Sequence, residues 1–500
     1  EIVHFFEQNL ARVRMRMMNL MRMFVTYANA ADTGLDAALT ETDPAATASA
    51  AGAAPPASRL AIHPARPRQH IDGFGASMTE ASAWLFLNAM RDPDRILTEL
   101  FSDTDGIGLS LLRQPIGPSD HVVRPYRFLR RRADPTLDSL DFSHEIRAIL
   151  PPVGAAARLR ARSQEALPAG QRTPLRVIAS PWSAPANMKT NHSVLGRRPI
   201  SRLIGRLKPS SHGAYAELIA RFCALYRQYG VDIFAVTPVN EPDLAHSLWP
   251  TMAMSPAEQA RFVARSLAPR LRAHGLGDVR ILCWDHNYST RHFPEGRFVR
   301  EVYARPDALA ALAGSAWHYY GGDVRTLDAI HRDWPDKGIW VTEASGGDWG
   351  PRNWDAALMT MGGAVCSMMQ HWARCAILWN VALDGRHAPD WYYVRRQLRH
   401  AQNRGLVSVD RATGEVTRNA DFYALAHFSR FVAPGSACVD SDLSDGRGMQ
   451  AVAFRTERYG VVAVVVNERP EAAAVEVAVD GARPVRVTLP PRSLTTLTDC

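Results

Sequence analysis

Eight short apolar runs recur between residues 71 and 384, and stretches of helical character separate them. The runs are rich in β-branched and aromatic residues and cover residues 71–79, 107–117, 174–182, 233–241, 279–287, 314–320, 338–345 and 375–384. Parallel strands that are buried on both faces give runs of this kind, because neither face calls for polar side chains. Eight such strands alternating with helices predict an α/β fold, the (β/α)8 TIM barrel.

Two of the intervening stretches show the helical pattern most clearly. Residues 212–230 and 255–275 place apolar side chains three and four positions apart, and each stretch ends on glycine. The second stretch opens with Ser255 and Pro256, an N-cap residue followed by proline at the first helical position. These features support helical connections between the predicted strands.

Polar and aromatic side chains collect where the apolar runs end. In barrel enzymes the carboxyl ends of the strands carry the catalytic groups. A single polar residue there could be a cap or a buried hydrogen-bonding group, but repetition from strand to strand is hard to explain by packing. The residues at these ends are Arg113, Trp182, Asn240, Glu241, Asp285, His286, His318, Tyr320, Glu343, Trp379 and Asn380.

Glu241 and Glu343 are the only glutamates among these strand ends, and 102 residues separate them. At roughly 31 residues per βα unit, this spacing predicts that they end strands 4 and 7, on opposite sides of the barrel. Glycoside hydrolysis uses two facing carboxyl groups, one to protonate the leaving oxygen and one to attack the anomeric carbon. Asn240, beside Glu241, could then hydrogen-bond the 2-hydroxyl of the sugar.

Seven sequence blocks, taken in order, resemble glycoside hydrolase family 30, the family of glucosylceramidase and β-1,6-glucanase. The blocks are IDGFGASMTEA, LLRQPIGPSDH, ASPWSAPANMKTN, VTPVNEP, AWHYY, WVTEASGG and LWNVALD. The resemblance runs from about residue 58 to the C-terminus. It implies that Glu241 is the acid/base, that Glu343 is the nucleophile, and that hydrolysis retains configuration through a covalent glycosyl-enzyme.

The same resemblance implies a set of sugar-binding residues. It places them at Arg113, Asp120, Trp182, Asn240, Tyr320 and Trp379, with His318 beside the pocket and Asn380 as a further candidate. Retention requires the two carboxyl groups to lie about 5–5.5 Å apart. We expect the negative charge of Glu343 to raise the pKa of Glu241, and we expect Arg113 and Tyr320 to donate hydrogen bonds to Glu343 or to the sugar.

The leading interpretation is a retaining β-glycosidase that acts on β-linked glucose in a glucosylceramide-like or β-1,6-glucan-like substrate. The same chemistry on a β-xyloside, β-fucoside or β-galactoside is one alternative. A catalytically silent barrel that binds carbohydrate is another, although the two glutamates and Asn240 argue against it. The interpretation calls for a carbohydrate or glycolipid substrate, no cofactor and no metal.

The pattern changes at both ends of the chain. Residues 426–500 alternate short strands with tight turns, which predicts an antiparallel β-sandwich domain behind a barrel of residues 71–425. The resemblance adds residues 58–70 to the sandwich as strands. Residues 1–57 are first basic and Met-rich and then rich in Ala, Pro, Ser and Thr, so we expect a disordered or signal-like extension that folding does not need.

Charge and targeting features limit the partners and the location. The formal charge of +8 is dispersed and no binding motif accompanies it, which argues against a nucleic-acid partner. The densest basic patch, residues 124–132, could make peripheral contact with an anionic surface. Residues 28–30 (Ala-Asn-Ala) have the form of a signal-peptidase site, which favours a secreted or periplasmic location and leaves a cytoplasmic one open. The sequence indicates no oligomeric state.

Overall fold

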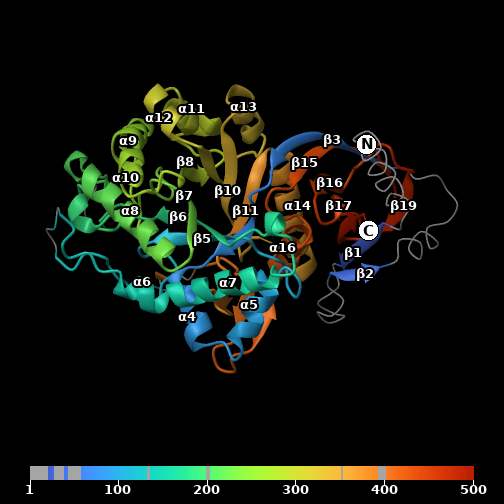
Figure 1. Ribbon diagram of the computed structural model, residues 1–500, viewed down its shortest axis with the longest axis horizontal. Coiled ribbons are helices and arrows are strands. Elements are labelled where there is room, and N and C mark those ends of the chain that lie inside the picture. The colour runs from blue at the N-terminus through green and yellow to red at the C-terminus, as the bar shows by residue number, and fades with distance from the viewer. Residues whose placement is uncertain are drawn as a thin grey trace. The chain divides into compact units, whose positions relative to one another are not determined.

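The computed structural model describes residues 21–27, 39–42, 58–131, 134, 136–198, 203–350, 353–391 and 401–499. The chain divides into two compact units (Figure 1). The barrel unit comprises Phe74–Trp349 and His371–Asn419, and the sandwich unit comprises Glu1–Gly73, Gly350–Gln370 and Ala420–Cys500.

Eight parallel strands close into a barrel in the order β10-β11-β4-β5-β6-β7-β8-β9. They are β4 (Gly73–Ser77), β5 (Leu111–Ile116), β6 (Arg176–Pro181), β7 (Asp232–Val236), β8 (Arg280–Asn287), β9 (Gly314–His318), β10 (Gly338–Ala344) and β11 (Ala373–Leu378). Apolar side chains from these strands, among them Leu111, Phe234 and Trp340, form one buried cluster. The predicted TIM barrel is confirmed, and Glu241 and Glu343 belong to its fourth and seventh strand positions.

Helices connect the strands and lie around the outside of the barrel (Figure 1). They are α4 (Glu80–Asn88), α5 (Pro93–Phe101), α6 (Ser143–Ala148), α7 (Leu150–Ser163), α8 (His212–Gln228), α9 (Pro256–Phe262), α10 (Ala268–Ala273), α11 (Arg297–Tyr303), α12 (Pro306–Ala311) and α13 (Thr326–Asp333). A π-helical turn, Val263–Leu267, joins α9 to α10. A small sheet of β12 (Ala382–Asp384), β13 (Val407–Val409) and β14 (Val416–Arg418) follows β11.

Local sequence explains the bounds of the two helical segments that were predicted. Ser255 caps α9 and forms a reciprocal capping box with Glu258. Gly230, which follows α8, and Gly275, which follows α10, take positive φ values of 73° and 68°. Glycine adopts this left-handed conformation without steric cost, so each helical segment ends at its glycine.

A nine-stranded sheet forms the sandwich unit in the order β19-β18-β3-β15-β16-β17-β20-β1-β2. Its strands are β1 (Arg22–Tyr27), β2 (Thr40–Thr42), β3 (Ser58–His70), β15 (Ala437–Ser444), β16 (Met449–Thr456), β17 (Gly460–Asn467), β18 (Ala473–Val479), β19 (Val485–Leu489) and β20 (Ser493–Thr498). One apolar cluster holds Met23 from β1 together with Val487 from β19, so both ends of the sheet face a common core.

Two helices pack against this sheet, and both begin within residues 71–425, which we expected to belong to the barrel. They are α14 (Trp354–Gln370) and α16 (Ala420–Ser429), which contact each other and also contact strand β20. Contacts within the chain therefore group them with the sandwich unit. Among the described residues, no helix is both long enough and apolar enough to cross a membrane.

The expectation that residues 1–57 stay outside the fold is wrong for β1. This strand pairs with β20 on one side and β2 on the other, and Met23, Phe24, Val25 and Thr26 are buried. The sequence RMFVTY has the β-branched and aromatic content of a strand, which its basic, Met-rich surroundings concealed.

Two contacts hold β1 in the sandwich unit. His427 on α16 contacts the hydroxyls of Thr26 and Thr496 at 2.8 Å each. Phe24 packs on Phe431, with a distance of 4.8 Å between ring centroids. The signal-like residues 28–30 lie outside the described residues, and cleavage there would remove β1 from the chain. A secreted or periplasmic location stays a prediction.

We expect Met23→Ala to lower the free energy of unfolding by about 2–5 kcal/mol, the usual cost of truncating a large core side chain. Met23 is fully buried in the apolar cluster. Urea unfolding followed by circular dichroism measures the effect. Thr40→Ala on the exposed edge strand β2 is the control and should change the free energy by less than about 0.5 kcal/mol. Equal effects of the two substitutions would show that β1 adds nothing to the core.

Candidate active site

Side chains from the carboxyl ends of the barrel strands line one cavity of about 590 Å³. Seven of the ten predicted site residues line it: Asp120, Trp182, Asn240, Glu241, Tyr320, Glu343 and Trp379. Trp249, Tyr319, Trp349 and Asn403 complete the lining. The structure therefore brings the two predicted catalytic glutamates to the same cavity.

Arg113, on β5, lies fully buried beneath this cavity. Its Nη1 donates to Oε2 of Glu343, and its Nη2 donates to Oδ1 of Asn240 at 2.7 Å and to Oδ2 of Asp285 at 3.0 Å. Burial lowers the pKa of Arg113, but the negative charges of Asp285 and Glu343 outweigh burial and raise it. One guanidinium thus holds groups from three other strand positions, and Arg113 donates to Glu343 as expected.

Asp285 ends a predicted strand, but no sequence motif marks it as a site residue. It is fully buried and accepts hydrogen bonds from five side chains: Arg113, Ser180, Thr237, His318 and Thr342. Burial raises the pKa of Asp285, but the charge of Arg113 and the bonds from His318 and Ser180 hold it well below its usual range. Asp285 is therefore the negative counterpart of Arg113.

An irregularity in β8 explains why Asp285 and its neighbour His286 both reach the site. The pairing of β8 with β9 shifts register between Trp284 and His286, and Asp285 takes a φ of 67°. In a regular strand, neighbouring side chains point to opposite faces, whereas a bulge re-aims them. The sequence carries no plain signal for this bulge, which is why His286 was not selected either.

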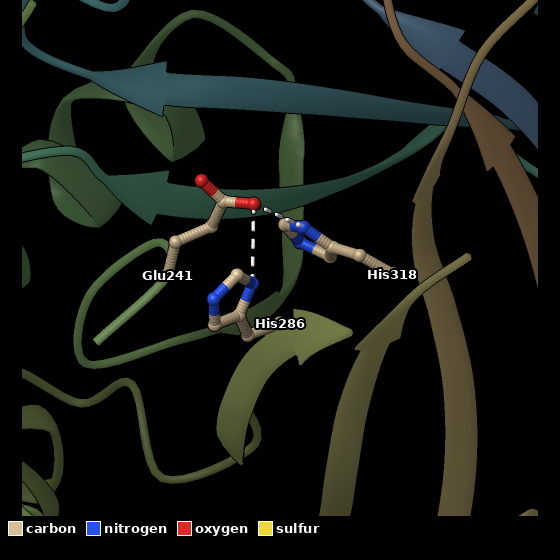
Figure 2. Close-up of side chains that lie close together, drawn as sticks. All are labelled: Glu241, His286 and His318. Carbon is tan, nitrogen blue, oxygen red and sulfur yellow. Dashed lines mark hydrogen bonds and ion pairs between the residues drawn. The ribbon is translucent and has the colours of Figure 1, made fainter. Parts of the chain in front are cut away.

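Two imidazoles point at one carboxylate oxygen of Glu241 (Figure 2). Nδ1 of His286 lies 3.1 Å from Oε1 of Glu241, and Nδ1 of His318 lies 3.3 Å from the same atom. Burial raises the pKa of Glu241, but the two imidazoles outweigh burial and hold it well below its usual range. The expected rise in this pKa is therefore wrong, because the sequence argument considered only the charge of Glu343.

His318 carries the proton that Glu241 lacks. Burial lowers the pKa of His318, but the charge of Glu343 and the bonds to Asp285 and Glu241 raise it to about 9. At neutral pH the imidazole is protonated, so its Nδ1–H donates to Glu241 and its Nε2–H donates to Asp285. Since interacting groups titrate as a unit, this proton belongs to the Glu241–His318 pair rather than to either residue alone.

Glu241, His286 and His318 also form a group that could hold a metal ion. Their ligand atoms lie within 4.8 Å of one another, and imidazole and carboxylate are ligands that zinc accepts. Each imidazole already faces Glu241, and His318 also bonds Asp285. We therefore interpret the trio as a group that holds and moves a proton.

Aromatic side chains and Asp120 form another part of the cavity wall. Trp182 and Trp379 stack with centroids 4.9 Å apart, and the indole of Trp379 donates to Asp120 over 3.4 Å. Burial raises the pKa of Asp120 to about 6; the charges of Glu343 and Glu241 act in the same direction, and His121 opposes them. The Tyr320 hydroxyl is buried, and burial together with the charges of Glu343 and Glu241 holds its pKa well above the ordinary value.

Three of the predicted site residues do not line the cavity. Arg113 and His318 are fully buried; Arg113 bonds Glu343 and His318 bonds Glu241, and both of these glutamates line the cavity. Asn380 is also fully buried, and its Oδ1 accepts a bond from Thr79 at 2.7 Å. Asn380 therefore supports the wall next to Trp379 rather than facing the cavity.

The structure adds lining residues that the sequence analysis did not select. Trp349 is 48% exposed at the cavity and lies edge-on to Tyr320. Trp349 follows Glu343 and Asp348 in the chain, and an aromatic residue so close to a predicted catalytic glutamate is the signal that could have found it. Trp249 and Asn403 lie in loops, where strand periodicity gives no guidance.

We expect Asp285→Asn to destabilise the barrel unit by about 3–5 kcal/mol, the usual cost of removing one partner of a buried ion pair. The pKa of His318 should fall below 9, because one of its anionic partners is lost. Chemical unfolding and NMR titration of the imidazole measure the two effects. Asp278→Asn, which removes an exposed partner of Arg227, is the control and should cost less than about 1 kcal/mol. Similar costs for both variants would contradict the central role of Asp285.

Comparison with known proteins places this geometry in a family. The glycosyl hydrolase family 30 TIM-barrel domain matches residues 71–432, and the family 30 β-sandwich domain matches residues 435–497. The mouse lysosomal acid glucosylceramidase is 26% identical over 429 residues, which cover 82% of this chain and 78% of that protein. An endo-1,6-β-D-glucanase of Neurospora crassa is 28% identical over 416 residues, which cover 81% and 80%.

A solved structure agrees over nearly the whole chain. The structure of an endo-β1,6-glucanase superposes with a TM-score of 0.80 at 27% identity, covering 96% of this chain and 100% of that one. The barrel match alone spans well over half of the 500 residues. With a closed eight-stranded barrel, a β-sandwich and two glutamates in one cavity, the chain belongs to glycoside hydrolase family 30 and is a β-glycosidase with a carbohydrate or glycolipid substrate.

Proposed function

We propose that the protein hydrolyses β-linked glucose with retention of configuration, with Glu343 as the nucleophile and Glu241 as the acid/base. The observation that carries this proposal is the different setting of the two carboxyl groups in one cavity. Glu343 receives the Arg113 guanidinium, whereas Glu241 faces two imidazoles, one of which is protonated at neutral pH. A nucleophile needs a stable negative charge, and an acid/base needs a proton source within reach.

In the first step, a carboxylate oxygen of Glu343 attacks the anomeric carbon. The bond between that carbon and the leaving oxygen breaks, and Glu241 delivers a proton to the leaving oxygen. His318 supplies this proton to Glu241 across their 3.3 Å contact. The products are a covalent glucosyl-enzyme on Glu343 and the released alcohol.

In the second step, a water molecule takes the place of the leaving group. Glu241 accepts a proton from the water, the water oxygen attacks the anomeric carbon, and the bond to Glu343 breaks. The proton returns to the Glu241–His318 pair, which restores the starting state. Two inversions at the same carbon give retention overall.

Polar groups in the wall suit the hydroxyls of one sugar. Oδ1 of Asn240 is engaged by Arg113, so its amide NH2 is the group left to meet the 2-hydroxyl. The buried Tyr320 hydroxyl and the carboxyl group of Asp120 provide further hydrogen bonds. Trp379 adds an apolar surface for the sugar ring. The choice of β-linked glucose rests on the glucosylceramidase and 1,6-glucanase relatives.

We expect Glu343→Gln to abolish turnover of every substrate and Glu241→Gln to act in a substrate-dependent way. An aryl β-glucoside with a good leaving group needs little protonation, so its first step should survive in Glu241→Gln while the glucosyl-enzyme accumulates. Azide needs no base, so it should restore turnover of Glu241→Gln and give a β-glucosyl azide. Mass spectrometry of the intermediate and NMR of the product measure both results.

The reverse pattern would overturn the two roles. Azide would then rescue Glu343→Gln with an α-configured product, and Glu241→Gln would remain inactive on the aryl glucoside. A panel of aryl β-glucosides, β-xylosides, β-fucosides and β-galactosides, run beside glucosylceramide and β-1,6-glucan, tests the sugar. Clear preference for another sugar would reject glucose while leaving the chemistry in place.

Substrate affinity should fall as the pH drops through about 6. The pKa of Asp120 is raised to about 6, so Asp120 is ionised above that pH and protonated below it. An ionised carboxylate accepts stronger hydrogen bonds from sugar hydroxyls than the neutral acid does. We expect KM of the wild type to rise several-fold between pH 7 and pH 5, whereas Asp120→Asn should have a higher KM that varies little with pH. A wild-type KM that stays flat would reject this role for Asp120.

A further inference from the structure

A second cavity of about 520 Å³ lies in the barrel unit, on the loops that follow β5 and β6. Its walls are largely apolar and include Ile116, Tyr126, Phe128, Leu129, Tyr215 and Leu218. Arg127, Arg131 and Arg198 also line this cavity, and all three are exposed. The cavity thus combines an apolar interior with three guanidinium groups.

The second cavity shares a wall with the catalytic cavity. Trp182 lines the catalytic cavity, whereas its neighbours Pro181 and Ser183 line the second one. Likewise, Trp249 lines the catalytic cavity and the next residue, Pro250, lines the second one. A group that extends from the catalytic cavity across this wall would therefore meet the second cavity next.

A buried lysine stabilises the shared wall. Nζ of Lys189 lies within hydrogen-bonding distance of four oxygen atoms: the Ser183 hydroxyl at 2.8 Å and the carbonyls of Val194, Leu195 and Thr251 at 2.7–3.0 Å. Burial holds the pKa of Lys189 well below its usual value. These bonds tie together the loop after β6 and the segment beside Trp249, so the wall is formed before any ligand binds.

The arginine-bearing loop is held in place as well. Phe128 is buried and meets Phe142 edge-on, with centroids 4.9 Å apart, and Tyr126 stacks on His144 at 4.2 Å. Leu129 pairs with Leu140 through a β-bridge. The loop backbone is therefore fixed at both sides of Arg127.

The charges of this cavity are unbalanced. None of its lining residues is acidic, and none of Arg127, Arg131 and Arg198 forms an ion pair with a described residue. Arg130, one position before Arg131, differs: it pairs with Asp141 at 2.6 Å and does not line the cavity. Arg198 also donates to the carbonyl of His192 at 3.1 Å, but no described carboxylate neutralises the lining arginines, so their charge is available to an anion.

We propose that the second cavity binds an anionic group carried on an apolar part of the substrate, beyond the sugar that is cleaved. The arginines would hold a carboxylate, sulfate or phosphate, for which the guanidinium is well matched, and the apolar walls would cover the adjoining chain. This inference rests on the proposed β-glucosidase function and names its substrate class as β-glucosides of amphiphilic, negatively charged alcohols.

A matched pair of substrates tests the inference: 7-carboxyheptyl β-D-glucoside and its primary amide, which share the sugar and the alkyl chain and end in a charged and a neutral group of similar size. We expect wild-type kcat/KM to be about ten-fold higher for the acid at low salt, and the preference to shrink in 0.5 M NaCl. In Arg127→Gln/Arg131→Gln/Arg198→Gln the ratio should approach one. Arg130→Gln removes a neighbouring charge that is already paired, and it should keep the wild-type ratio. Equal rates for acid and amide, or an equal loss in Arg130→Gln, would overturn the inference.

A second measurement separates failure of this inference from failure of the proposed function. Octanoate and octanamide lack the sugar, and saturation-transfer NMR reports their binding without turnover. Octanoate should bind more tightly than octanamide, and the triple variant should lose the difference. If neither glucoside is hydrolysed but octanoate binds in this way, the glucosidase function fails and the anion site stands. If both glucosides are hydrolysed alike and octanoate does not bind, the function stands and the anion site fails.

Discussion

The bonds of one buried guanidinium shape the catalytic end of this barrel. Arg113 is fully buried, and such a cation is stable only where carboxylates and acceptors surround it. Its partners Asn240, Asp285 and Glu343 come from three other strand positions. Any change of register that moved one of them would leave a charge unpaired in the interior. The ion pairs thus fix the strand ends relative to one another, and the same bonds orient the proposed nucleophile.

Several residues at the rim of the barrel have backbone conformations that residues other than glycine rarely adopt. Glu241, Asp285 and Asn380 have φ values of 49°, 67° and 74°. Such conformations cost on the order of 1–3 kcal/mol each and persist where the surroundings enforce them. Here the amide of Glu241 donates to the carbonyl of Asp285 at 3.0 Å, and Asn380 is held by Thr79. The strained turn after Asn240 delivers an amide and a carboxylate side by side into one cavity.

Structural features that follow from the periodicity of apolar residues can be predicted from the sequence. Features that depend on a local irregularity of a strand, or on a partner distant in the chain, cannot. All eight barrel strands and both cavity glutamates followed from apolar runs and their ends. His286 was not selected, because a bulge in β8 redirects it and no residue pattern marks that bulge. The pKa of Glu241 was predicted in the wrong direction, since the responsible imidazoles lie on two other strands. Strand β1 was missed because six residues of strand character lie inside a basic, Met-rich stretch.

The proposed catalytic groups and the arginines of the second cavity lie on parts of the barrel unit that tolerate substitution to different degrees. The proposed catalytic groups lie at strand ends among buried charges that bond one another, where a substitution at Asp285 or Arg113 disturbs several partners at once. The arginines of the second cavity lie on loops and have no ion-pair partner among the described residues, so their replacement leaves no buried carboxylate unpaired. Loops tolerate change far better than the elements they connect. On these proposals, the charge of the accepted substrate can change through the loops after β5 and β6 while the proposed proton path through His318 stays intact.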